Sequence, residues 1–98
     1  MKLVIDIDGT ICTQEKDYSK AKPFLDRISQ FNKLYDEGCV IIYYTARGTE
    51  TGIDWREVTE QQFDRWGVKY HDLLFGKPSA DYYIDDKGIN YERWIKSE

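Results

Sequence analysis

The chain has 98 residues, a net charge of −4 and two cysteines. This length allows one modest hydrophobic core, so we expect a single domain over residues 1–98. The negative charge argues against nucleic acid as a partner, because phosphate backbones are bound by clustered Lys and Arg. No apolar run approaches the roughly 20 residues that span a bilayer, and the apolar stretch at the N-terminus is too short for a signal peptide. We therefore expect a cytoplasmic protein that contacts no membrane.

The first half of the chain is predicted to form a strand, a loop, a helix and a second strand. Residues 2–7 are a short apolar run with β-branched side chains, which is typical of a buried parallel strand. Residues 9–20 are polar and aperiodic and indicate a loop. Pro23 favours a helix start, the apolar residues after it have helical spacing, and Gly38 is typical of a helix C-terminus. Residues 39–44 predict a second buried strand.

The second half repeats this alternation with shorter elements. Asp54 and Glu57 form a sequence typical of a capped helix start, and Gly67 suits the end of that helix. The later elements are expected to be a strand at residues 68–75, a strand at residues 81–84 and a closing helix at residues 90–96. Helices within the crossovers imply an α/β fold with a parallel sheet of about four strands and helices on both faces.

Polar residues follow the ends of all the expected strands. They are Asp6, Asp8, Thr45, Lys77, Asp85 and Asp86. In an open parallel sheet ligands bind beyond the carboxyl ends of the strands, so we expect these side chains to converge there. Four crowded carboxylates repel one another and need a nearby cation. Mg²⁺ suits this role because it binds carboxylates, waters and phosphate oxygens.

These residue types can carry out phosphoryl transfer. A carboxylate such as Asp6 can attack phosphorus and form an aspartyl-phosphate. A second carboxylate, Asp8, can protonate the leaving oxygen and then deprotonate the incoming water. Thr45 can donate a hydrogen bond to a phosphoryl oxygen, and Lys77 can neutralise the charge on the phosphoryl group.

The motif Asp6-Ile7-Asp8-Gly9-Thr10 resembles the first motif of the haloacid dehalogenase superfamily. A chance match to Asp-x-Asp-Gly-Thr is of order 10⁻⁵ per position. Residues 40–45 look like the second motif, Lys77 like the third and Ile84-Asp85-Asp86 like the fourth, in the order of the family. The resemblance implies a three-layer, Rossmann-like core.

The same resemblance assigns roles to particular residues. It implies that Asp6 is the nucleophile and a Mg²⁺ ligand, and that Asp8 is the general acid/base, with its backbone carbonyl on the metal. Asp at position 8 is the pattern of the phosphatases in this superfamily and not of its dehalogenases. Asp85 or Asp86 completes the implied metal site. The residues expected to contact substrate are Thr45, Lys77, Gly9, Thr10, Ala46 and Arg47.

The segment between the first two motifs is too short for a helical cap. This layout is similar to the small capless phosphatases of capsule and surface-polysaccharide biosynthesis. The similarity implies a small phosphorylated substrate such as a sugar phosphate. An uncapped site also suggests either a large substrate or a homo-oligomer in which a neighbouring subunit covers the site.

Several further side chains allow two interpretations. Arg47 could bind a substrate phosphate or carboxylate, or it could be a solvated loop residue. His71 and Cys12 are interpreted as structural, because His71 has no evident partner and nothing near Cys12 in the sequence would activate a thiol. Cys39 is expected in the core. Tyr18, in the first loop, is the aromatic residue expected to reach a substrate.

Two other functions compete with a phosphatase. A receiver-type signalling domain also carries acidic residues, Thr and Lys at strand ends, but its paired acids come on the first strand and its phosphoacceptor on the third. In this chain the nucleophile motif comes first and the Asp85-Asp86 pair last. The other alternative is a non-catalytic binding module on the same fold, because a fold does not determine a function.

Overall fold

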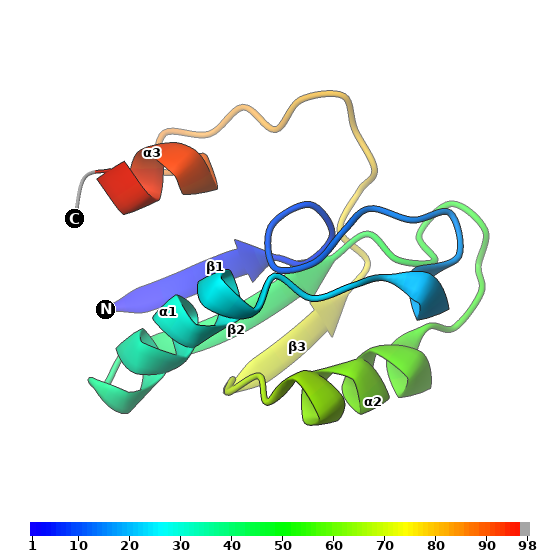
Figure 1. Cartoon of the computed structure of the whole chain (residues 1–98). Coiled ribbons are helices and arrows are strands. Elements are labelled where there is room, and N and C mark those ends of the chain that lie inside the picture. The colour runs from blue at the N-terminus through cyan, green and yellow to red at the C-terminus, as the bar shows by residue number, and fades with distance from the viewer. Residues whose placement is uncertain (97–98) are drawn as a thin grey trace.

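The structure is a computed structural model that describes residues 1–96 (Figure 1). Three parallel strands form one sheet in the order β1 (Lys2–Asp6), β2 (Val40–Thr45) and β3 (Asp72–Phe75). The helices are α1 (Leu25–Asp36), α2 (Arg56–Trp66) and α3 (Tyr91–Lys96), with a short 3-10 helix, η1 (Tyr18–Lys20). The predicted α/β fold with a parallel sheet is therefore confirmed. Within the described residues no helix has the length and apolar character needed to cross a membrane.

The strand register brings the carboxyl ends of the three strands to one edge of the sheet. Asp6 pairs with Tyr44, and Thr45 pairs with Phe75. Residues that follow these strands, including Asp8, Arg47 and Lys77, therefore leave the sheet at the same edge, as the sequence predicted. At the opposite end the His71 ring accepts a hydrogen bond from the Ile41 N–H at 3.0 Å, so His71 has a structural contact.

Both long helices pack against the same face of the sheet (Figure 1). Ile5, Tyr43 and Leu73 share that face and are buried against the helices. On the other face Val4 is 60% exposed and Leu74 is 41% exposed. The expectation of helices on both faces is therefore not met by residues 1–96. Right-handed crossovers that advance in one direction, from β1 to β2 to β3, place their helices on a single side.

The expected fourth strand at residues 81–84 is not formed. Tyr82 is 84% exposed and Ile84 is 98% exposed, and neither belongs to the sheet. Only residues 76–80 separate this segment from β3, whereas parallel strands are ordinarily joined by a dozen or more residues. The segment instead stays near the end of β3, where the Lys77 ammonium lies 4.1 Å from the centre of the Tyr83 ring.

Helix ends explain the remaining differences from the predicted boundaries. Gly67 has a left-handed backbone (φ 68°) at the end of α2, as predicted. The Val68 N–H then bonds to the Phe63 carbonyl at 2.9 Å, which completes a Schellman-type helix end. Val68 thus belongs to the helix terminus, and β3 begins at Asp72 instead of residue 68. At the start of α2, Asp54 accepts a hydrogen bond from the Arg56 N–H at 2.9 Å.

Candidate functional site

A pocket of about 410 Å³ opens at the carboxyl edge of the sheet, and we call it the acidic pocket. It is lined by side chains from separate segments of the chain. Asp6 and Asp8 come from the end of β1, Tyr18 from η1, and Ala46 and Arg47 from the loop after β2. Ser79, Ala80 and Tyr83 of the segment after β3 complete one side. The convergence expected from the strand ends is therefore observed for these residues.

Asp6 is the last residue of β1 and lies within reach of Lys77. The Lys77 Nζ is 3.5 Å from Asp6 Oδ1. Burial raises the pKa of Asp6 above its ordinary value, the Lys77 charge opposes this shift, and the neighbouring Asp8 charge adds to it. The Asp6 carboxylate is thus partly desolvated, and the charge of Lys77 offsets only part of the pKa increase that burial causes.

Asp8 forms a two-point ion pair with Arg47. The guanidinium donates from Nε to Asp8 Oδ2 at 3.0 Å and from Nη2 to Asp8 Oδ1 at 2.9 Å. The side chain of Arg47 is 0% exposed and that of Asp8 is 15% exposed. Parallel hydrogen bonds of this kind fix the plane and the direction of a carboxylate.

The remaining nitrogen of the Arg47 guanidinium is held by helix α2. Nη1 donates to Gln62 Oε1 at 2.6 Å and to Thr59 Oγ1 at 3.0 Å. The Tyr18 ring lies 5.0 Å from the guanidinium carbon. Arg47 is therefore neither a solvated loop residue nor a guanidinium free for a substrate, because protein groups occupy its donors. Thr59 and Gln62 were missed in the sequence, although both lie on the apolar side of α2 with Phe63.

Thr45 and Lys77 are joined by the backbone. The Lys77 N–H donates to the Thr45 carbonyl at 3.1 Å. Thr45 is buried, and its hydroxyl oxygen accepts a hydrogen bond from the Arg47 N–H at 3.0 Å. Because that bond uses an acceptor site of the hydroxyl, the Thr45 proton is left to be donated. Thr45 does not itself line the acidic pocket.

Gly9 and Thr10 form the tight turn after Asp8 and do not line the acidic pocket. Gly9 has a positive φ of 84°, and its N–H donates to the Cys12 carbonyl at 2.8 Å. The thiol of Cys12 is buried beside Asp8, and burial together with the Asp8 charge raises the pKa of Cys12 to about 12. Cys12 is thus a neutral thiol at physiological pH, in keeping with the packing role expected for it.

Asp85 and Asp86 lie apart from the acidic pocket. Both are exposed, and neither lines the pocket with Asp6 and Asp8. Asp85 Oδ1 accepts a hydrogen bond from the Lys87 N–H at 2.8 Å, and this bond holds the pKa of Asp85 below its usual range. Within residues 1–96 no three His, Cys, Asp or Glu side chains are grouped as metal ligands.

The Asp6 carboxylate is nevertheless suited to a hard cation. Carboxylate oxygens are the ligands that Mg²⁺ prefers, and it commonly uses one or two of them with waters and phosphate. A cation beside Asp6 would offset the burial that raises the pKa of this carboxyl group. The residues present in the pocket therefore fit Mg²⁺.

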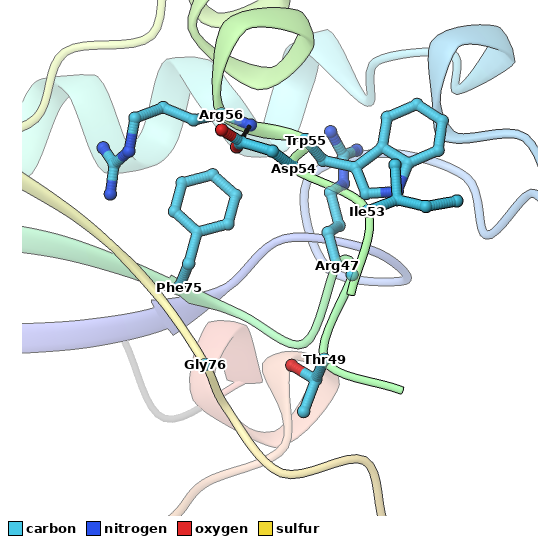
Figure 2. Close-up of a pocket in the computed structure, with 9 residues that line it drawn as sticks. Arg47, Thr49, Ile53, Asp54, Trp55, Arg56, Phe75 and Gly76 are labelled. Atoms are coloured by element: carbon cyan, nitrogen blue, oxygen red, sulfur yellow. Dashed lines mark hydrogen bonds between the residues drawn. The ribbon is translucent and has the colours of Figure 1, made fainter. Parts of the chain in front are cut away.

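A second hollow of about 220 Å³ lies beside the loop that carries Arg47 (Figure 2). Phe75, Ile53 and Trp55 supply apolar surface, and the Arg56 guanidinium carbon lies 4.6 Å from the centre of the Phe75 ring. Arg47 lines both hollows. The loop after β2 thus contributes lining residues to both the acidic pocket and this more apolar hollow.

The fold and the pocket define a small α/β protein with an acidic site at the carboxyl edge of a parallel sheet. No family model and no curated protein matches the chain. The crystal structure of a target protein from Vibrio cholerae matches with a TM-score of 0.86 and 30% identity, over 95% of this chain and 85% of that one. The chain therefore belongs to the same family as the Vibrio cholerae protein.

A more distant match is a chain in the structure of a Pnkp1/Rnl/Hen1 complex. It has a TM-score of 0.62 and 20% identity, and the match covers 97% of this chain but 34% of that one. At this identity the likeness shows a shared fold alone. The small α/β fold of this protein therefore also occurs as part of a longer chain.

Proposed function

We propose that this protein is a Mg²⁺-dependent phosphohydrolase of the haloacid dehalogenase type, which cleaves phosphate monoesters through an aspartyl-phosphate on Asp6. The observation that carries the proposal is the acidic pocket, which both Asp6 and Asp8 line, with the Lys77 ammonium, itself not a lining group, 3.5 Å from Asp6. A carboxylate nucleophile, a second carboxylate for proton transfer and a cation for phosphoryl charge are the groups that this reaction requires.

The chemistry divides into two steps. Asp6 attacks phosphorus and forms a P–O bond, while the bond to the leaving oxygen breaks and that oxygen takes a proton from Asp8. Asp8 then accepts a proton from water, which attacks the aspartyl-phosphate and releases inorganic phosphate and free Asp6. Lys77 neutralises negative charge on the transferring group, and Thr45 can donate its hydroxyl proton to a phosphoryl oxygen.

Mg²⁺ would be held by the Asp6 carboxylate and the Asp8 backbone carbonyl, with Asp85 or Asp86 completing its ligands. When bound, it would neutralise charge on the phosphoryl oxygens and orient the phosphate for attack. Within residues 1–96 the outer edge of β1 has no neighbouring strand, and we propose that the fourth strand of a haloacid dehalogenase core would add there. A parallel sheet of about four strands, with the fourth beside β1, is part of the proposal.

The proposed substrate is a small phosphorylated metabolite, with a sugar phosphate as the first choice and surface-polysaccharide synthesis as the setting. Gln14, Glu15 and Ser79 line the acidic pocket and offer hydrogen-bonding groups for hydroxyls. A cytoplasmic location and a homo-oligomer that covers the open pocket belong to the same proposal.

One observation favours a second candidate function. Asp85 and Asp86 are exposed and stand outside the acidic pocket. If this arrangement persists with a ligand present, the carboxylates are not gathered for catalysis. The chain would then be a non-catalytic binding module that retains the pocket.

The test is magnesium-dependent release of phosphate from p-nitrophenyl phosphate and from a panel of sugar phosphates. Wild type is compared with Asp6→Asn, and Asp64→Asn, at an exposed position on α2, is the matched control. We expect activity in wild type and Asp64→Asn and none in Asp6→Asn. Equal release by wild type and Asp6→Asn across the panel would rule out the phosphatase and favour the binding module.

A further inference from the structure

We propose that Gln62, together with Thr59, is a positioning residue for proton transfer: it fixes the Arg47 guanidinium, and Arg47 in turn fixes the Asp8 carboxylate. This inference rests on the proposed function, in which Asp8 is the general acid/base. Neither α2 residue touches the acidic pocket, so the proposed effect is transmitted through Arg47.

The geometry of arginine makes this transmission direct. A guanidinium is planar and rigid, so a contact at one nitrogen sets the direction of the other two. Gln62 Oε1 accepts from Nη1 at 2.6 Å, and the opposite edge of the same group, Nε and Nη2, meets Asp8 at 3.0 and 2.9 Å. A shift at Gln62 would therefore rotate the edge that holds the Asp8 carboxylate.

An amide is the side chain that suits position 62. Gln62 accepts from Arg47 through Oε1 and donates through Nε2 to the Tyr18 carbonyl at 2.6 Å. Glutamate could not donate to that carbonyl, and it would place a second carboxylate on Arg47 in competition with Asp8. A methionine of similar shape would make neither bond. The demand for both a donor and an acceptor identifies the amide itself as the functional group.

Thr59 contributes a second acceptor in the same manner. Its hydroxyl accepts from Arg47 Nη1 at 3.0 Å and donates to the Trp55 carbonyl at 2.8 Å. Thr59 and Gln62 are fully buried beside Phe63. Buried polar groups are costly unless they are fully hydrogen-bonded, and here each side chain accepts from Arg47 through its oxygen and donates to a backbone carbonyl.

Gln62 also ties the rim of the acidic pocket to the same network. Its bond to the Tyr18 carbonyl anchors η1, and the Tyr18 ring packs over the Arg47 guanidinium at 5.0 Å and in a T-shaped contact with Trp55. Tyr18 lines the pocket. One side chain thus couples the wall that faces the substrate to the orientation of Asp8.

The experiment compares Gln62→Met with Gln61→Met, a matched control one residue earlier on the exposed side of α2. Each protein is assayed with an alkyl phosphate and with p-nitrophenyl phosphate. Protonation of the leaving oxygen matters greatly for an alkoxide and little for p-nitrophenolate. We expect Gln62→Met to lower kcat/KM, which reports the step that releases the leaving oxygen, about 10- to 100-fold for the alkyl phosphate, with a much smaller loss of kcat/KM for p-nitrophenyl phosphate. Gln61→Met should match wild type.

Two further variants keep the test decisive if Gln62→Met fails to fold. Thr59→Val removes one of the two acceptors of Arg47 Nη1. It should lower activity on the alkyl phosphate more than activity on p-nitrophenyl phosphate, by a smaller factor than Gln62→Met does. Thr59→Ser keeps the hydroxyl and should behave like wild type. Equal losses of kcat/KM for both substrates, or none in a folded variant, would overturn the positioning role while leaving the phosphatase intact. Wild type that cleaves neither substrate would overturn the proposed function, and this inference with it.

Discussion

Arg47 and Asp8, far apart in the chain, form a two-point ion pair at the wall of the acidic pocket, with bonds of 3.0 and 2.9 Å. The guanidinium is fully buried, whereas the carboxylate keeps 15% exposure. One partner therefore belongs to the interior and the other to the pocket. The pair links the buried acceptors of α2 to the residue that we propose transfers protons.

The stability of this ion pair can be tested with Asp8→Asn. The substitution leaves the buried Arg47 charge without its partner, and we expect it to lower the free energy of unfolding by about 3 kcal/mol. Urea titration measures this change. The control is Asp36→Asn, which breaks the exposed pair between Asp36 and Lys69 (2.7 Å) and should cost at most about 1 kcal/mol. Similar losses in both variants would mean that Arg47 does not depend on Asp8.

Asp6→Asn should abolish turnover and yet stabilise the protein at neutral pH. Because burial raises the pKa of Asp6, the folded state favours the protonated form. The stability that wild type gains from a protonated Asp6 is fully present below the unfolded pKa of about 3.9. It is lost as the pH rises through the pKa of Asp6 in the folded state. Asparagine stays neutral, so the melting temperature of Asp6→Asn should exceed that of wild type at pH 7, and the difference should shrink towards pH 4. A lower melting temperature at pH 7 would show that the ion pair with Lys77 outweighs the burial.

The loop that carries Arg47 depends on a glycine. Gly48 has a φ of 80°, and a Cβ there would lie 2.0 Å from the Ile53 carbonyl oxygen. Gly52 has a similar φ of 73° but open space around it, which makes Gly52→Ala a matched control for the backbone strain. We expect Gly52→Ala to cost about 1 kcal/mol in unfolding free energy and Gly48→Ala clearly more, because the loop must also move.

Gly48→Ala should also reduce the proposed phosphatase activity, since the displaced loop carries Arg47 away from Asp8. Chemical denaturation and phosphate release measured on the same preparations check both effects. Equal costs for the two glycine variants would show that the loop yields without strain.

Mg²⁺ should raise the melting temperature when inorganic phosphate or an analogue is present, because a ligand that binds the native state stabilises it. At a ligand concentration of 100 times Kd the gain is about 2.7 kcal/mol. Asp85→Asn or Asp86→Asn should reduce the shift, and whichever has the larger effect identifies the direct ligand. An unchanged shift in both variants would leave these two residues outside the metal site, and no shift in wild type would argue against a metal site in the pocket.

Much of this fold follows from local sequence patterns. The apolar runs at β1 and β2, the helical spacing of α1 and α2, and Gly67 at the end of α2 were all predicted, since strand and helix formation depend on neighbouring residues. The alternation of strands and helices also places Asp6, Asp8 and Lys77 at one edge of the sheet. The carboxyl ends of parallel strands meet there, whatever the details of packing.

Other features depend on contacts between distant segments, which no local pattern encodes. Arg47 was open to two interpretations in the sequence, and only the tertiary structure shows it bound to Asp8, Thr59 and Gln62. The segment at residues 81–84 has the composition of a strand, yet the short connection after β3 leaves it outside the sheet.

The sequence by itself thus determined the class of fold and the position of the acidic motif, because both arise from periodicity and chain order. The tertiary structure decided what the buried Arg47 pairs with, because a guanidinium in the interior must find its acceptors wherever the packed helices and loops bring them.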